Sequence, residues 1–168
     1  MLSPNQLHHD PTFTLSRCEN LAVAAWWDAP TVAQIGVVER NMDVMRRAFR
    51  DEMAFVNVIV AGRIESFSKD VREAANRLTE KHPRSLCVAN VVLVEGIAGV
   101  LTRTIMRAMR MVGRNESPWR VFDNCAAAAA WIAPHLDGHA SLVWSSDDVL
   151  AVLNQAAGRA QPPGAIQR

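Results

Sequence analysis

The pattern of apolar and polar residues along the chain predicts strands that alternate with helices. Apolar and polar residues alternate over residues 12–16, as in a half-buried strand, and residues 21–27 follow after a short turn, so the pair predicts a hairpin. Further strands are expected at residues 55–61, 86–94 and 118–122. The first two of these are almost continuously apolar, which is typical of central strands buried on both faces.

Helices are expected between and after these strands. They cover residues 31–50, residues 69–81 with Ser68 as the cap, residues 97–112, an alanine-rich segment that ends at Ile132, and residues 146–157. This order, β-β-α-β-α-β-α-β-α with one added C-terminal helix, predicts an α/β fold. We expect a mostly parallel sheet of about five strands, one antiparallel hairpin strand, and helices on both faces.

Length and turn residues indicate one domain with loose ends. The 168 residues lie within the usual range for a single domain. Residues 1–11 are polar and contain two prolines, and residues 159–168 contain proline and glycine, so both are expected to be flexible tails. The domain itself would span residues 12–136, and residues 137–158 would add the last helix.

The helix over residues 31–50 carries more apolar surface than one side of a sheet requires. One stripe contains Ile35, Val38, Met42, Met45 and Phe49. A second stripe beside it contains Ala33, Val37, Val44 and Ala48. Because a helix on a sheet needs only one apolar face, either the added C-terminal helix or a second copy of the chain is expected to cover the second stripe.

Composition and charge narrow the classes of function. The net charge of +1 argues against general nucleic-acid binding, which requires a clustered basic excess. No apolar run approaches the roughly 20 residues that cross a bilayer, and no signal peptide follows Met1, so a cytoplasmic location is expected. The three cysteines, Cys18, Cys87 and Cys125, are widely spaced, which favours reduced thiols over disulfides or a zinc site.

The segments that follow the expected parallel strands gather polar residues. Because ligands of such sheets bind beyond the carboxyl ends of the strands, these residues form one candidate site, which contains Asp28, Arg63, Glu65, Ser66, Ser68 and Glu95. Helix N-termini at this edge would favour an anion such as a phosphate. The alternative is that these residues only cap the turns between strands and helices.

The helix over residues 97–112 carries a row of arginines. Arg103, Arg107, Arg110 and, just past the helix, Arg114 are spaced by four, three and four residues, so they form one stripe opposite the apolar face. Such a stripe is either a solvated face or a docking strip for an acidic partner or anionic lipid headgroups.

Common motifs of enzymes and metal sites are absent from the sequence. It contains no GxSxG, P-loop or GxGxxG pattern, and its histidines show no HExxH spacing. We therefore expect no metal, no cofactor and no enzymatic activity. Gly96 and Gly99 are interpreted as positions where a helix approaches a strand closely.

Several local patterns resemble a known family. The most specific is Trp119-Arg-Val-Phe-Asp123, followed by an Ala-x-x-Trp-Ile helix end, and a hairpin before Asp28-Ala-Pro-Thr31 also fits. Over about residues 13–136 the chain resembles the SpoIIAA-like branch of the STAS domains, the sulphate transporter and anti-sigma factor antagonist domains. The resemblance implies a regulatory domain that binds another protein.

The resemblance also points to a candidate phosphorylation site. In phosphorylated STAS proteins, a serine of an Asp-Ser-Ser-Gly stretch after the middle strand is the target of a kinase. The corresponding segment here, residues 63–70, keeps Ser66 and Ser68 but lacks that motif. The resemblance makes Ser66 and Ser68 candidate phosphoacceptors, whereas Ser68 is also a plain helix cap.

The sequence therefore supports three functional hypotheses. The first is a non-enzymatic, STAS-like interaction or regulatory module that binds a protein partner and associates with itself through Val37, Val44 and Ala48. The second is the binding of a lipid or other hydrophobic small molecule between the sheet and the first helix. The third, from another class, is a hydrolase or transferase with Asp28, Glu65 and Glu95 at the strand ends.

Overall fold

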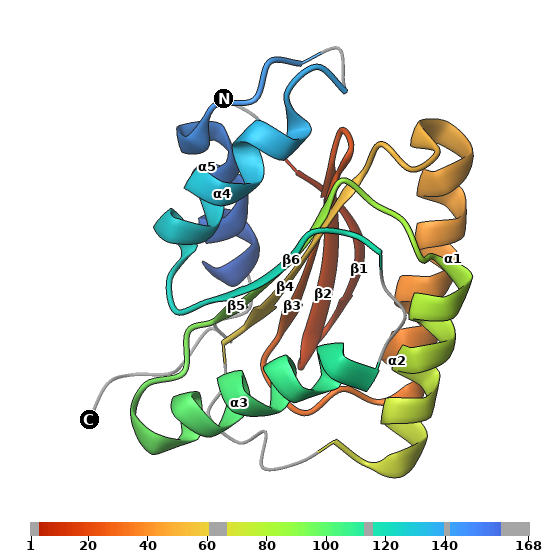
Figure 1. The fold of residues 1–168 in the computed structure, drawn as a ribbon, viewed down its shortest axis with the longest axis vertical. Helices are drawn as coiled ribbons and strands as arrows, with labels where there is room; N and C mark the ends of the chain where they lie inside the picture. Colours follow the sequence, from red (N-terminus) through yellow and green to blue (C-terminus); the bar gives the residue numbers. More distant parts are fainter. Residues whose placement is uncertain (1–3, 61–66, 113–115, 140–141, 159–168) are drawn as a thin grey trace.

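A mixed sheet of six strands forms the centre of the structure, a computed structural model that describes residues 4–60, 67–112, 116–139 and 142–158 (Figure 1). Its strands, in chain order, are β1 (Asn5–Asp10), β2 (Phe13–Cys18), β3 (Leu21–Trp26), β4 (Ala54–Ile59), β5 (Cys87–Val92) and β6 (Trp119–Phe122). Each strand lies beside the one before it in the chain. β1, β2 and β3 pair antiparallel, and β3 to β6 pair parallel.

The structure confirms an α/β fold with a mixed sheet, but two expectations about the start of the chain are wrong. We expected about five strands and a flexible tail over residues 1–11, whereas Asn5–Asp10 is β1 and brings the number of strands to six. β1 is an edge strand without a fully buried side chain, so its sequence lacks the alternation that marks the other strands. The side chain of Gln34 donates hydrogen bonds to Asp10 and so holds the end of β1.

The helices cover both faces of the sheet, as expected. They are α1 (Val32–Phe49), α2 (Lys69–Lys81), α3 (Gly96–Val112), α4 (Cys125–Leu136) and α5 (Ser146–Gly158). α1 and α2 lie on one face and α4 and α5 on the other, while α3 runs beside β5 and β6 (Figure 1). Right-handed crossovers between consecutive parallel strands place the connecting helices on the same face, which explains why α1 and α2 are neighbours.

The observed helix bounds lie close to the predicted ones, with one difference at α4. Thr31 opens α1 through a capping box with Gln34, and Ser68 caps α2 as expected. α4 continues through Pro134 to Leu136 instead of ending at Ile132. Proline removes a single backbone hydrogen bond, and the loss is small because Pro134 lies in the last turn.

Two apolar cores lie on opposite faces of the sheet. On one face, α4 and α5 pack against β-strand side chains such as Leu21, Val23 and Val56. On the other face, α1 packs against side chains such as Phe13 and Trp26. α5 contacts α4, β2 and β3 and therefore lies on the face opposite to α1. The added C-terminal helix thus does not cover the second stripe of α1.

Candidate ligand-binding cavity

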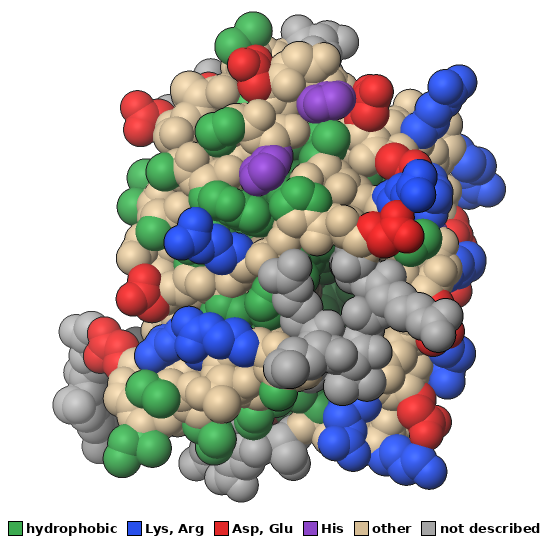
Figure 2. Space-filling model, in the orientation of Figure 1, with side chains coloured by type: hydrophobic (Ala, Val, Ile, Leu, Met, Phe, Trp, Pro, Cys, Tyr) green, Lys and Arg blue, Asp and Glu red, His purple; other side chains and the backbone are tan. Residues whose placement is uncertain are grey.

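A cavity of about 200 Å³ lies between the sheet and helices α1, α2 and α3. It forms because α2 packs beside α1 and makes few contacts with β4 and β5, the two strands that it connects. Ala75, Leu78 and Thr79 of α2 face this space and remain half-buried. Figure 2 shows a hollow near the middle of the molecule with apolar side chains at its bottom.

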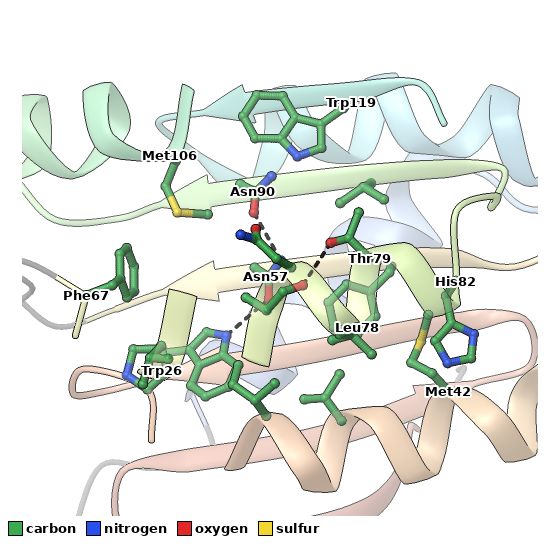
Figure 3. Close-up of a pocket in the computed structure, with 18 of the residues that line it drawn as sticks. Trp26, Met42, Asn57, Phe67, Leu78, Thr79, His82, Asn90, Met106 and Trp119 are labelled. Carbon is green, nitrogen blue, oxygen red and sulfur yellow. Dashed lines mark hydrogen bonds between the residues drawn. The ribbon is translucent and has the colours of Figure 1, made fainter. Parts of the chain in front are cut away.

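Two asparagines form the polar floor of the cavity. Asn57 of β4 and Asn90 of β5 are register partners on neighbouring strands, so their side chains project from the same face of the sheet. The Nε1 of Trp26 donates to Oδ1 of Asn57 at 3.2 Å, and Nδ2 of Asn57 donates to Oδ1 of Asn90 at 3.0 Å (Figure 3). The three side chains form one hydrogen-bonded ladder across β3, β4 and β5.

This ladder ends at a donor without a partner. Asn90 is only 1% exposed, and its Nδ2 has no hydrogen-bond partner among the described residues. Figure 3 shows this amide nitrogen on the side of Asn90 that faces Trp119 of β6. A buried N–H group without a partner is unfavourable, so this atom marks a point where a bound molecule would gain a hydrogen bond.

Apolar and aromatic side chains form the walls of the cavity. Phe67 and Met106 lie at one end, and Met42 lies at the other (Figure 3). The remaining apolar lining residues include Pro30, Ile35, Val38, Phe55, Ile59, Val71, Ala75, Leu78 and Val88. In the described part of the chain, no Asp, Glu, Lys or Arg side chain lines this space. The lining thus suits an uncharged, mostly apolar molecule.

His82 lies at the same end as Met42 and is uncharged at neutral pH. Its side chain is buried, and this burial lowers the pKa of the imidazole, although the nearby Asp43 carboxylate opposes the effect. The Nε2 atom lies 3.2 Å from Oδ1 of Asp43, but the geometry forms no hydrogen bond with either ring nitrogen. The imidazole therefore adds no positive charge to the cavity.

The strand-end candidates that the structure describes, Asp28, Ser68 and Glu95, lie outside this cavity. The carboxyl ends of β3, β4 and β5 do meet at one edge, since Trp26, Ile59 and Val92 are register partners. The described candidates Asp28, Ser68 and Glu95 are exposed there.

Two of these described candidates serve local turns. Asp28 accepts a hydrogen bond from the backbone N–H of Ala29, and Ser68 accepts one from Val71. Arg63, Glu65 and Ser66 lie outside the described residues. The anion site, the phosphoacceptors and the hydrolase hypothesis thus stay predictions.

Two of the three contact residues predicted on α1 are exposed to solvent. Val37 is half-buried against the core, whereas Ala48 is exposed and Val44 is 48% exposed. Val44 lies among Arg40, Asp43, Arg46, Arg47 and Lys81. Among the described residues, the part of the second stripe that contains Val44 and Ala48 is therefore exposed, but charges border it.

We expected the arginines of α3 to lie opposite a buried apolar face, but the apolar residues of its first turns are exposed. Arg107 is exposed and Arg103 half-buried, while the Arg110 side chain and Arg114 lie outside the described residues. The large apolar residues of the first turns also face solvent: Ile97 is 90% exposed, Val100 58% and Leu101 47%. In these first turns the fully buried positions of α3 are instead the small residues Gly99 and Thr102.

Gly99 explains this orientation of α3. Its position is buried, and a Cβ there would collide with the carbonyl group of Val94. The prediction of close helix–strand packing is therefore confirmed at Gly99 and wrong at Gly96, where a Cβ would meet nothing within 4 Å. Because the glycine side must face the end of β5, Ile97 and Leu101 are turned outwards.

Sequence reasoning did not identify Asn57 and Asn90 as site residues. Each is a polar residue within an otherwise apolar strand, and this was the available signal. Cys18, Cys87 and Cys125 are buried and free. Within the described ranges, the structure shows no cluster of metal ligands and no helix that could span a membrane.

Comparisons with known proteins add no relative. No family model, no curated protein and no solved structure matches the chain. The resemblance to STAS domains therefore stays a prediction, and functional inference depends on the geometry of the chain itself.

Proposed function

We propose that the protein binds a small, uncharged, mostly apolar molecule in the cavity between the sheet and helices α1, α2 and α3. The observation that carries this proposal is the cavity of about 200 Å³. Protein interiors normally contain few voids larger than a water molecule. The cavity also lies on the face that the hypothesis of a ligand between the sheet and the first helix requires.

The volume limits the size of the ligand. Pockets for drug-sized molecules usually measure roughly 300–1,000 Å³, and an apolar cavity of about 150 Å³ can hold benzene. A cavity of about 200 Å³ therefore suits a molecule with one aromatic ring and a short substituent, or the end of an acyl chain. A whole lipid is too large for this volume.

The hydroxyl groups in the lining favour binding over catalysis. Thr79 Oγ1 donates a hydrogen bond to the carbonyl of Ala75 at 3.0 Å. Ser85 Oγ donates to Ser117 Oγ at 3.0 Å. A nucleophilic hydroxyl requires an adjacent general base, and these two donate to a backbone carbonyl and a second hydroxyl instead.

Filling the cavity tests the proposal. Toluene should shift the NMR signals of the Trp26 and Trp119 indole N–H groups, which lie in the lining. Ala75→Leu places extra methyl groups in the same space and should weaken toluene binding at least about tenfold. Because the added atoms fill a void, the variant should remain as stable as the wild type.

A matched alanine on the other face of the sheet provides the control. Ala130 of α4 is exposed, so Ala130→Leu should leave toluene binding unchanged. Binding that survives Ala75→Leu, or the absence of any shift at both indoles in the wild type, would contradict the proposal.

A second function is proposed for α3, namely docking on an anionic lipid surface. Ile97, Val100 and Leu101 form an exposed apolar row on its first turns, visible over the N-terminal end of α3 in Figure 2. Arg103 and Arg107 follow on the next turns. Exposed apolar residues with flanking basic residues are typical of helices that lie in a membrane interface.

Vesicle sedimentation tests this second function. The protein should bind vesicles that contain phosphatidylglycerol more tightly than vesicles of phosphatidylcholine, and added salt should weaken the binding. Ile97→Asp should reduce binding at least about tenfold. Val143→Asp is the control because Val143 is 80% exposed elsewhere on the chain. Equal loss in both variants, or no vesicle binding by the wild type, would contradict membrane docking.

A further inference from the structure

We infer that the ligand of the cavity carries an uncharged hydrogen-bond acceptor, such as a ketone, aldehyde or amide carbonyl, which binds to Nδ2 of Asn90. This inference rests on the proposed function, since it names the chemical class of the molecule in the same cavity. It depends on the donor-to-acceptor direction of the hydrogen bonds in the ladder and on the lack of charged side chains in the described lining.

The polarity of the ladder is fixed by Trp26. An indole N–H is a donor only, so the atom of Asn57 that faces Nε1 of Trp26 must be Oδ1. The amide nitrogen of Asn57 is then directed to Asn90, where it requires an acceptor, and Oδ1 of Asn90 fills that role. The remaining group of Asn90 is therefore the NH₂.

The free amide of Asn90 is buried and belongs to a residue that lines the cavity. Asn90 and Trp119 both line the cavity, and the amide nitrogen lies on the side of Trp119 (Figure 3). Asn90 is 99% removed from solvent, as its exposed fraction is 1%. A neutral carbonyl oxygen placed there would accept the hydrogen bond that Nδ2 lacks among the described residues.

The charge of the surroundings selects a neutral acceptor over a carboxylate. Burial of an anion is unfavourable unless a cation or several donors compensate for it. The described lining offers no Lys or Arg side chain, and His82 is uncharged at neutral pH. Trp26, Phe67 and Trp119 can contact the ring of an aromatic ligand. An aryl ketone thus combines the features that the cavity selects.

Two probes of the same shape test the inference. Acetophenone carries a carbonyl group, and α-methylstyrene replaces its oxygen with a CH₂ group. In NMR titrations of the full chain, acetophenone should bind about five- to tenfold more tightly, since one neutral hydrogen bond contributes about that much. Benzoate, the carboxylate of similar size, should bind more weakly than acetophenone.

A variant pair assigns the preference to Asn90. Asn90→Leu removes the donor and should bring the affinities of acetophenone and α-methylstyrene within about twofold of each other. Asn76→Leu is the control, because Asn76 of α2 lines the same cavity without belonging to the ladder, and it should keep the preference. In the wild type, acetophenone alone should move the side-chain amide proton signals of Asn90 downfield, a readout that does not depend on any variant folding.

The outcomes separate this inference from the proposed function. Equal binding of the two isosteric probes, or tighter binding of benzoate, would overturn the neutral acceptor and leave the cavity as an apolar binding site. Binding by none of the three probes would overturn the inference together with the proposed function. If the Asn90→Leu variant still prefers acetophenone over α-methylstyrene, Asn90 does not bind the carbonyl group.

Discussion

Asp10 shows how one side chain can order a segment that the sequence pattern leaves open. Its carboxylate accepts hydrogen bonds from the backbone N–H of Thr12 at 2.8 Å and from Nε2 of Gln34 at 3.1 Å. Burial alone would raise the pKa of Asp10, but the hydrogen bonds from Gln34 and Thr12 outweigh it and lower that pKa to about 2. The ionised carboxylate thus joins the end of β1 to α1.

Replacing Asp10 with alanine should therefore lower the free energy of unfolding by about 1–2 kcal/mol at neutral pH. Because the pKa of Asp10 is lower in the folded state, its ionised form stabilises the fold above about pH 4, and this stabilisation is lost as the pH falls towards 2. Urea unfolding at several pH values checks both statements. Asp28→Ala, at an exposed carboxylate, should have little effect on the free energy of unfolding at neutral pH. An equal loss in both variants would contradict the role of Asp10.

At the residue scale the sequence allows only part of the candidate site to be predicted. Asn57 and Asn90 are visible as polar residues inside buried strands, but they lie 33 residues apart. Only the register of β4 against β5 brings them together. The free donor is harder still to foresee, because it depends on the direction in which Trp26 orients the ladder.

Helix α1 carries the prediction of self-association. Among the described residues, Val44 and Ala48 of its second stripe are exposed, and Val44 is the larger of the two. Light scattering should show mass above that of a monomer at high micromolar concentration, and Val44→Glu should restore the monomer. Val32→Glu is the control because Val32, 45% exposed, lies outside the stripe. A monomeric wild type would contradict the prediction.

At the element scale, the sequence predicts where the helices lie in the chain better than it predicts which side of each helix is buried. The bounds of α2 agree with the predicted residues 69–81 because Ser68 caps one end and Pro83 follows the other. For α3, the spacing of apolar and basic residues defines the faces but does not say which face is buried. Gly99 decides that question through a contact with Val94 that no periodicity contains.

On the scale of the whole molecule, Trp144 ties the end of the chain to its beginning. This residue is buried before α5, and its Nε1 donates to Oδ1 of Asn20 at 3.1 Å. Asn20 lies in the turn between β2 and β3, and its Nδ2 donates to the carbonyl of Glu52. One buried asparagine therefore connects three distant segments.

Trp144→Phe should lower the free energy of unfolding by about 2 kcal/mol, since it removes the indole N–H and leaves Oδ1 of Asn20 unpaired. The midpoint of urea unfolding measures the loss. Trp131→Phe, at a half-buried tryptophan of α4, should cost clearly less. The reverse order of the two losses would show that side-chain volume, not the hydrogen bond, determines the effect.

The α/β class follows from the alternation of strands and helices, but the global position of α5 does not. The sequence shows an amphipathic last helix without indicating which face of the sheet it covers. Its contacts with β2 and β3 depend on the space that α4 leaves on that face.

The sequential strand order has a consequence for how the chain acquires its structure. Each strand pairs with the strand just before it, so most pairings connect segments that lie close in the chain and can form progressively during synthesis. The contact between Asn20 and Trp144 is different because it spans 124 positions. Until α5 emerges from the ribosome, the apolar side chains of Leu21 and Val23 lack the helix that packs against them. A nascent chain would thus expose an apolar face of the sheet to solvent, and the last helix to be translated would cover it.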